Sequence, residues 1–146
     1  MASGFYEMGV KHFGLGNLAW VFDASPTDGE NDNFKLSLVD TADYTVNLAT
    51  HEFRDAAGLA AGIEETSGSV TLTSAAANGV LDASDVTFTG TTGDTCEGVL
   101  LYQSKGSAAT DRLILWWDSE AGLPVTLGGD VTVQFGNVAG TLLARI

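Results

Sequence analysis

Two histidines and one cysteine are the residues of this chain best suited to general-base, nucleophilic or metal-binding chemistry. His12 and His51 lie far apart in the sequence, and neither has a His, Cys or Asp partner at the spacing of a metal-ligand motif. Cys96 is the only cysteine, which excludes an internal disulfide and fits assembly in a reducing cytoplasm. We therefore interpret the histidines as surface or locally bonded imidazoles and Cys96 as a small buried apolar side chain.

Sequence motifs for nucleophilic catalysis and phosphate binding are missing as well. No serine stands in a Gly-x-Ser-x-Gly nucleophile elbow. The glycine-rich pieces at 14–16 and 128–129 lack the following Lys-Ser/Thr of a phosphate-binding loop. The sequence thus predicts no catalytic residue, no cofactor-binding residue and no enzyme activity.

Two acidic loops are candidates for calcium binding. Residues 28–32 read Asp-Gly-Glu-Asn-Asp and superficially resemble a calcium loop, and residues 82–85 form a second cluster around Asp82 and Asp85. The first loop lacks the bidentate glutamate that closes an EF-hand loop, and no flanking helices are predicted. Solvated carboxylates are the better interpretation, so no metal ligand is assigned. Calcium bound at a loop or between subunits stays open.

Three tryptophans, Trp20, Trp116 and Trp117, have the ring area to stack on sugars or bases. Burial in a core or in a protein–protein contact is the more common use of such side chains. Their role therefore depends on the elements that carry them.

The elements that carry two of these tryptophans are predicted for residues 96–119, where two apolar runs flank a small polar loop. Alternation predicts two neighbouring strands in which Leu113, Leu115 and Trp117 share one face. Trp116 falls on the opposite face with Ile114, and with Val99 and Leu101 if the strand register allows. Both faces of both strands are apolar, so we expect this pair to be covered twice.

Two segments are candidates for covering the Trp116 face. The N-terminal segment can fold over it through Tyr6, Val10 and Phe13, or another subunit can do so. An uncovered apolar face of this size favours aggregation, and aromatic side chains are frequent anchors of interfaces. The residues that we assign to a protein interface on this basis are Phe5, Tyr6, Val99, Leu101, Ile114 and Trp116.

The rest of the chain alternates between short apolar-polar runs and turn residues. Strands are predicted at 17–23, 34–39, 44–48, 70–73, 86–89, 131–135 and 141–146, and a tight turn at Asn78-Gly79. A short amphipathic helix is expected within 5–15, and an irregular connection with a turn or two of helix within 49–62. The pattern predicts an all-β fold, an antiparallel β-sandwich or jelly roll of roughly eight or nine strands.

Length and charge limit the organisation and the partners. The 146 residues are enough for one domain, predicted to span 1–146 with an N-terminal arm or short helix at 1–16. The formal net charge of −13 disfavours direct binding to nucleic acid or to an anionic membrane. No apolar run is long enough to cross a bilayer, and the N-terminus lacks the pattern of a secretory signal.

Several segments resemble, in the same order, stretches of a group of small virion proteins of tailed double-stranded DNA bacteriophages. In the second half these are GVLDASDVTFTG (79–90), GDTCEGVLLYQ (93–103), ATDRLILWWDSEAGLPVT (109–126) and GGDVTVQFG (128–136). In the first half they are ASGFYEMGVKHF (2–13) and FKLSLVDTADYTVNLATHEF (34–53). The matching positions are framework strands and turns, and the pair Trp116-Trp117 is bulkier than the resemblance leads us to expect.

The resemblance implies a non-enzymatic structural role in the virion, most plausibly as a capsid decoration (cement) protein on the outer capsid surface, assembled in the host cytoplasm. Its implied partners are the major capsid protein and copies of itself, as a dimer or trimer. The acidity agrees with an outside position, because a chain of this charge would be repelled by packaged DNA. The alternatives are a tail, fibre or head-tail component, and a carbohydrate-binding β-sandwich that uses Trp20 or Trp116.

Overall fold

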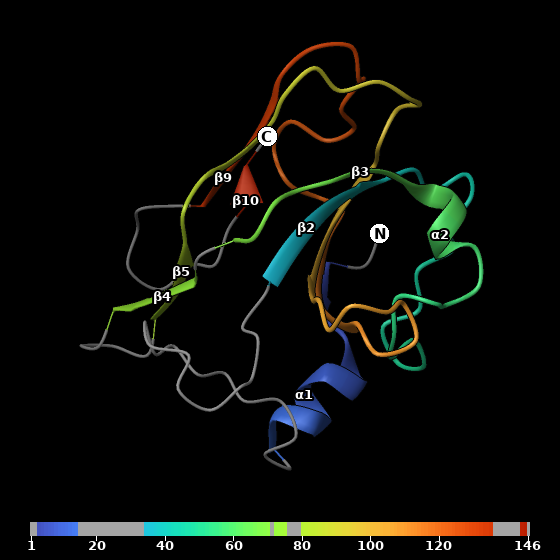
Figure 1. The fold of residues 1–146 in the computed structure, drawn as a ribbon, viewed down its shortest axis with the longest axis vertical. Helices are drawn as coiled ribbons and strands as arrows, with labels where there is room; N and C mark the ends of the chain where they lie inside the picture. Colours follow the sequence, from blue (N-terminus) through green and yellow to red (C-terminus); the bar gives the residue numbers. More distant parts are fainter. Residues whose placement is uncertain (1–2, 15–33, 71, 76–79, 136–143, 146) are drawn as a thin grey trace.

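The computed structural model describes residues 3–14, 34–70, 72–75, 80–135 and 144–145, and within them the chain is mostly β-structure with little helix (Figure 1). The elements in chain order are β1 (Gly4–Phe5), α1 (Glu7–Gly14), β2 (Phe34–Val39), α2 (Leu59–Gly62), β3 (Ile63–Thr66), β4 (Leu72–Ala75), β5 (Val80–Ala83), β6 (Val86–Phe88), β7 (Gly98–Gln103), β8 (Arg112–Trp117), β9 (Val131–Phe135) and β10 (Ala144–Arg145). The mostly β, antiparallel character predicted from alternation is therefore confirmed.

The strands form three antiparallel sheets. The largest has the order β1-β8-β7-β2-β3, a second has the order β10-β9-β6, and β4 pairs with β5. β7 and β8 are adjacent and antiparallel, as predicted for the apolar pair, and they occupy the middle of the largest sheet. β7 pairs with β2 on one side and with β8 on the other, and it is the middle strand of the five.

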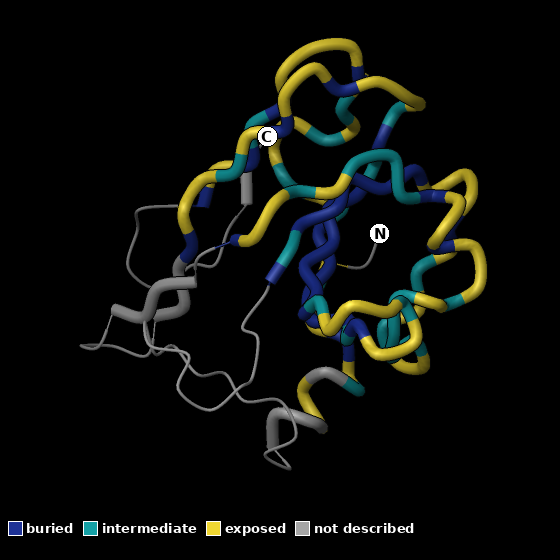
Figure 2. The backbone as a smooth tube through the Cα atoms, viewed as in Figure 1, coloured by how far each residue is buried: buried dark blue, intermediate teal, exposed yellow. Residues whose placement is uncertain are grey.

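Two clusters of buried side chains lie on the two faces of the five-stranded sheet. The large cluster fills the space toward β6 and β9, and its members include Leu36, Leu38, Phe88, Val99, Leu101, Ile114, Leu115, Trp117, Val131, Val133 and Phe135. The second, which we call the arm-side cluster, consists of Tyr6, Val39, Tyr44, Leu59, Leu100, Tyr102, Leu113 and Trp116. The expectation that β7 and β8 are covered on both faces is thus confirmed (Figure 2).

A β-bulge in β8 changes which residues share a face. Leu101 pairs with Leu115 and Tyr102 pairs with Leu113, so Ile114 is the extra residue between them. A bulge reverses the alternation beyond it. Leu113 consequently faces the arm-side cluster, whereas our alternation placed it with Leu115 and Trp117, and that assignment was wrong.

The neighbours of Trp116 also differ from those that we predicted, because of the bulge and the strand register. This residue pairs with Leu100 and lies in the arm-side cluster together with Leu100 and Tyr102. Ile114, which we placed on the same face, and Val99 and Leu101, which we placed there if the register allowed, all belong to the large cluster on the other face, so that grouping was wrong. The placement of Trp117 in a core is confirmed, since its ring meets Phe135 edge-on at 6.1 Å.

Residues 40–62 connect β2 to β3 on the arm side of the sheet, where Figure 1 shows this connection opposite β9 and β10. The strand predicted at 44–48 does not form, because Asn47 bends the chain instead. Its Oδ1 accepts the backbone amides of Ala49 and Thr50, both at 3.1 Å, and its carbonyl accepts the amide of His51. The short helices α1 and α2 confirm the helical segments predicted within 5–15 and 49–62.

Two predicted features fall outside the described residues, namely the strand at 17–23 and the turn at 78–79. The closing strand predicted at 141–146 is described at β10, which pairs with β9.

Candidate interaction surface and polar clusters

The six residues assigned to an interface differ sharply in exposure. Tyr6, Val99, Leu101 and Trp116 are 0% exposed and Ile114 is 1% exposed, because the two core clusters enclose them. Phe5 is 47% exposed, and among the described residues it and Val10 are the large apolar side chains that face solvent. Of the six, Phe5 therefore offers area for a partner, and its contact with one stays a prediction.

The chain itself covers the Trp116 face. Tyr6 arrives from the N-terminal side and Leu59 from α2, while the Tyr44 ring meets the indole edge-on at 5.9 Å. The sequence left two possibilities for covering this face, the N-terminal segment or another subunit, and the N-terminal segment does cover it. Of the three residues expected to make this contact, Tyr6 is the one that the described part of the chain shows in the arm-side cluster. Val10 points outward with half of its surface exposed, and the Phe13 side chain lies outside the described part.

The N-terminal arm, residues 3–14, is fixed by backbone hydrogen bonds. β1 adds to the edge of β8, with Gly4 opposite Trp116 and Phe5 opposite Leu115. Beyond β1, the Tyr6 amide donates to the Ile114 carbonyl at 3.0 Å. The Glu7 amide then donates to the Leu48 carbonyl at 2.8 Å, which places the first turn of α1 against the 40–62 connection. Phe5 and Val10 are thus presented from a defined position and not from a free tail.

A hydrogen-bonded row of three side chains lies beneath this arm, with both tyrosines buried and His51 partly buried. The Tyr6 and Tyr44 hydroxyl oxygens are 3.1 Å apart, and the Tyr44 hydroxyl is 2.8 Å from Nδ1 of His51. Burial raises the pKa of both tyrosines and lowers the pKa of His51. All three side chains are therefore neutral near pH 7, and His51 is the locally bonded imidazole that we predicted. The His12 side chain lies outside the described residues.

Three carboxylates meet at the far end of β2 and β3, an arrangement the sequence did not reveal. Asp40, Glu64 and Asp94 each offer an oxygen within 4.8 Å of the other two. Glu64 is the extra residue of a β-bulge, since Leu38 pairs with Glu65 and Val39 with Ile63. Carboxylate oxygens are the donors that Ca²⁺ and Mg²⁺ prefer, so these are the described residues best suited to hold a cation.

Two carboxylates of this acidic cluster accept backbone amides. Asp40 Oδ1 accepts the Ala42 amide at 2.6 Å, and Glu64 Oε2 accepts the Asp94 amide at 3.3 Å. Its field acts on Cys96, whose thiol pKa is raised to about 12 by burial first and then by Glu64 and its acidic neighbours. Cys96 is buried and unpaired, as predicted, and is too weakly acidic to serve as a nucleophile.

The acidic loops considered for calcium give no site in the described residues. Residues 28–32 and the Asp82 side chain lie outside that part of the chain. Asp85 is directed to the backbone, where its Oδ1 accepts the Phe135 amide at 3.0 Å and joins β6 to β9. That carboxylate has a structural role at the edge of the three-stranded sheet.

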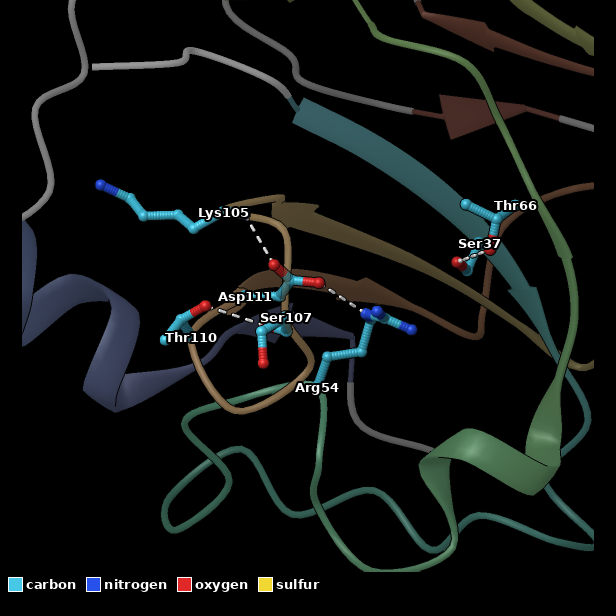
Figure 3. Close-up of polar contacts among 7 residues, drawn as sticks. All are labelled: Ser37, Arg54, Thr66, Lys105, Ser107, Thr110 and Asp111. Carbon is cyan, nitrogen blue, oxygen red and sulfur yellow. Dashed lines mark hydrogen bonds and ion pairs between the residues drawn. The ribbon is translucent and has the colours of Figure 1, made fainter. Parts of the chain in front are cut away.

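A charged pair fixes the loop between β7 and β8 (Figure 3). Asp111, 1% exposed, accepts the Lys105 amide at 2.6 Å and Arg54 Nε at 2.9 Å. The Arg54 guanidinium also lies over the Tyr102 ring, with its carbon 5.3 Å from the ring centre. These contacts hold the loop against the 40–62 connection, so we interpret them as structural.

A second ion pair, between Arg112 at the start of β8 and Glu52, has the same arrangement of a carboxylate and an aromatic ring around an arginine. Arg112 Nη1 bonds Glu52 Oε1 at 2.8 Å, and the guanidinium lies over the Phe53 ring at 4.9 Å. Both of these arginines are therefore committed to carboxylates and aromatic rings of the same chain, and neither presents an unpaired positive charge for an acidic ligand.

Comparison of the chain with known protein-family models, with curated proteins and with solved structures finds no match. Within the described residues, no helix has both the length and the apolar character needed to span a bilayer.

Proposed function

We propose that this chain is a non-enzymatic structural protein of a tailed-phage virion, and specifically a capsid decoration protein that binds the outer shell and stabilises it. The resemblance of its framework segments supports the kind of particle. The net charge of −13 supports a position outside the shell, because the genome would repel such a chain from the interior. Its proposed partners are the major capsid protein and further copies of itself.

We infer the contact surface from the uneven distribution of exposed apolar side chains. The five-stranded sheet is filled on both faces by the chain's own residues, whereas Phe5 and Val10 stand exposed on an arm that is hydrogen-bonded to β8 and to residue 48. Ordered apolar side chains on an otherwise acidic domain are suited to docking into a pocket of a neighbouring subunit. We assign the shell-facing side to this arm.

The fold proposed for this role is a β-sandwich of jelly-roll type. Its layers would be the five-stranded sheet and the β6-β9-β10 sheet. The large core cluster supports this assignment, because Leu36, Leu101 and Trp117 of the first sheet belong to the same cluster as Val133 and Phe135 of the second. A layered domain of this kind resists deformation, which suits a protein that clamps a shell under internal pressure.

The alternative roles differ in their support. A tail, fibre or head-tail component would use the same domain at low copy number, and copy number separates it from a decoration protein. A carbohydrate-binding module has less support, because Trp116 is 0% exposed and has no face free to stack on a sugar. Trp20 lies outside the described residues.

The proposal is tested on particles by reconstitution. Particles lacking the protein are incubated with the full chain, with the Phe5→Ser/Val10→Ser variant, or with an Ala60→Ser/Ala61→Ser control, which changes two exposed residues of α2. Unfolding midpoints of the free proteins first establish that all three are equally folded. We expect stoichiometric coverage of the shell and a higher disruption temperature with the wild type and the control, and neither with the arm variant.

Two results would contradict parts of this proposal separately. Occupancy of a few copies at one vertex would exclude the decoration role and favour the tail or head-tail alternative. Full coverage by the arm variant would leave the decoration role intact but exclude the arm as the contact surface.

A further inference from the structure

We propose that the Tyr6–Tyr44–His51 chain is a proton-sensitive latch that holds the N-terminal arm against β8 when His51 is neutral and loosens it when His51 is protonated. The latch is a property of the free chain and does not depend on what the arm contacts. The protonation state of His51 sets the direction in which the three polar groups of this row donate their hydrogens.

The burial of Tyr6 fixes that direction. Its side chain is 0% exposed, and the Tyr44 hydroxyl is its hydroxyl partner among the described residues. A buried hydroxyl hydrogen without an acceptor is costly, so Tyr6 must donate to Tyr44. Tyr44 then donates to Nδ1 of His51, which places the hydrogen of the neutral imidazole on Nε2. In this arrangement both the Tyr6 and the Tyr44 hydroxyl hydrogens have an acceptor.

Protonation reverses the chain of donors. The proton from solvent binds at Nδ1, the nitrogen that had accepted the Tyr44 hydrogen. Nδ1–H now donates to the Tyr44 oxygen, so three hydrogens share the two contacts of the row and one hydroxyl hydrogen, that of Tyr44 or of Tyr6, has no acceptor among these groups. Withdrawal of Tyr6 admits water to this contact and gives that hydrogen an acceptor, so the cationic state favours withdrawal of Tyr6.

The arm moves with Tyr6 because this residue joins β1 to α1. Its amide bonds the Ile114 carbonyl and its carbonyl accepts the Val10 amide at 3.1 Å. Withdrawal of the ring therefore strains the bonds that hold both flanking elements. Phe5 and Val10, the exposed apolar side chains of the arm, lie on either side of this joint.

The titratable and charged groups around the latch come from three elements. Tyr44 precedes His51 in the 40–62 connection, and Glu7 and Lys11 lie on α1, whose first amide bonds Leu48 of the same connection. Glu52 follows His51 and pairs with Arg112 of β8. The pKa of His51 is lowered by burial, in agreement with a site that favours the neutral imidazole.

Because the His51 pKa is lowered in the folded chain, the latch should hold the arm more firmly at higher pH. The folded chain with a docked arm binds the His51 proton less well than the unfolded chain does, because burial lowers the His51 pKa from the ordinary histidine value of 6.5. The contribution of the latch is therefore complete above that value. It is lost progressively as the pH falls through 6.5 toward the lower value of the docked state.

The test is amide hydrogen exchange measured by NMR on the full chain between about pH 8 and pH 5, together with the His51 imidazole titration. The reporting amides are those of Tyr6, Glu7 and Val10, corrected for the intrinsic pH dependence of exchange. Amides of β7 report on global unfolding. We expect the arm amides to open about tenfold more often at the acidic end, with β7 unchanged and a midpoint equal to the His51 pKa.

Variants separate the latch from a general loss of stability. His51→Asn places an amide oxygen close to the position of Nδ1 and cannot titrate, so the pH dependence of the arm should disappear while its protection at pH 8 remains. Tyr44→Phe interrupts the chain and should also abolish the pH dependence. His12→Gln, which changes the other histidine, should retain it.

The latch is excluded if the arm amides of the wild type show no additional opening across the His51 titration, or if His51→Asn keeps the full effect. Should His51→Asn fail to fold, the wild type and Tyr44→Phe still decide the question by the same comparison. Because these measurements use the free protein, their failure is distinct from failure of particle binding.

Discussion

Substitution of Gly98 by alanine is expected to destabilise the chain by steric conflict with one ring. Gly98 begins β7 and is buried, and a Cβ built on it would overlap Cζ2 and Cη2 of the Trp116 indole. The indole cannot move aside easily, because it is 0% exposed and its neighbour Tyr44 meets it edge-on. Either the ring or the start of β7 must shift.

The magnitude follows from the cost of overpacking a filled core, which is about 1–3 kcal/mol. A glycine replaced in a strand also recovers about 0.4–1 kcal/mol by restricting the unfolded chain, which offsets part of that cost. We expect a net loss of about 1–2 kcal/mol. For a domain of this length, such a loss lowers Tm by roughly 2–8 °C.

Urea unfolding followed by circular dichroism, with calorimetry for Tm, measures this loss. Gly68→Ala is the matched control, since a Cβ there meets nothing within 4 Å, and it should be neutral or stabilise the chain by up to about 1 kcal/mol. Trp116→Phe removes the outer edge of the indole, where the overlap lies. In a double-mutant cycle, Gly98→Ala should therefore cost about 0.5–3 kcal/mol less in the Trp116→Phe background. Equal effects at Gly98 and Gly68, or strict additivity, would refute the reasoning.

Two further predictions concern buried polar groups. Arg54→Ala leaves the buried Asp111 carboxylate with its backbone donor but without its charged partner, and should cost about 1–3 kcal/mol, with Arg54→Lys intermediate; unchanged urea midpoints would contradict this. Cys96, with a thiol pKa raised to about 12, should react slowly with a thiol reagent at pH 8 in the native state and rapidly in urea. Equal rates in both conditions would contradict the burial of its thiol.

The strands that could be predicted are those whose alternation is decided locally. β2, β6 and β9 each place apolar side chains on the core side at a period of two, and the described exposures follow that period in β9. The segment 44–48 alternates equally well but is not a strand. There the side-chain oxygen of Asn47 competes for backbone amides, and that short-range polar contact outweighs a weak strand pattern.

The faces of β8 could not be predicted for a different reason. When both faces of a strand are apolar, a shift of one residue exchanges one buried face for another, and the sequence pattern does not oppose it. The bulge at Ile114 is therefore invisible to alternation. The close packing of the Trp116 ring on Gly98 is also a contact between strands, which alternation within one strand does not reveal.

The polar sites depend on topology to a still greater extent. Asp40, Glu64 and Asp94 come together because β2 pairs with β3 and because a bulge exposes Glu64 at that edge, and neither fact can be inferred from spacing. Helical spacing likewise grouped Tyr6 with Val10, yet Tyr6 precedes α1 and is buried while Val10 is exposed. One residue therefore anchors the arm through Tyr44 and His51, while Phe5 and Val10 remain exposed, which is the arrangement that the proposed contact requires.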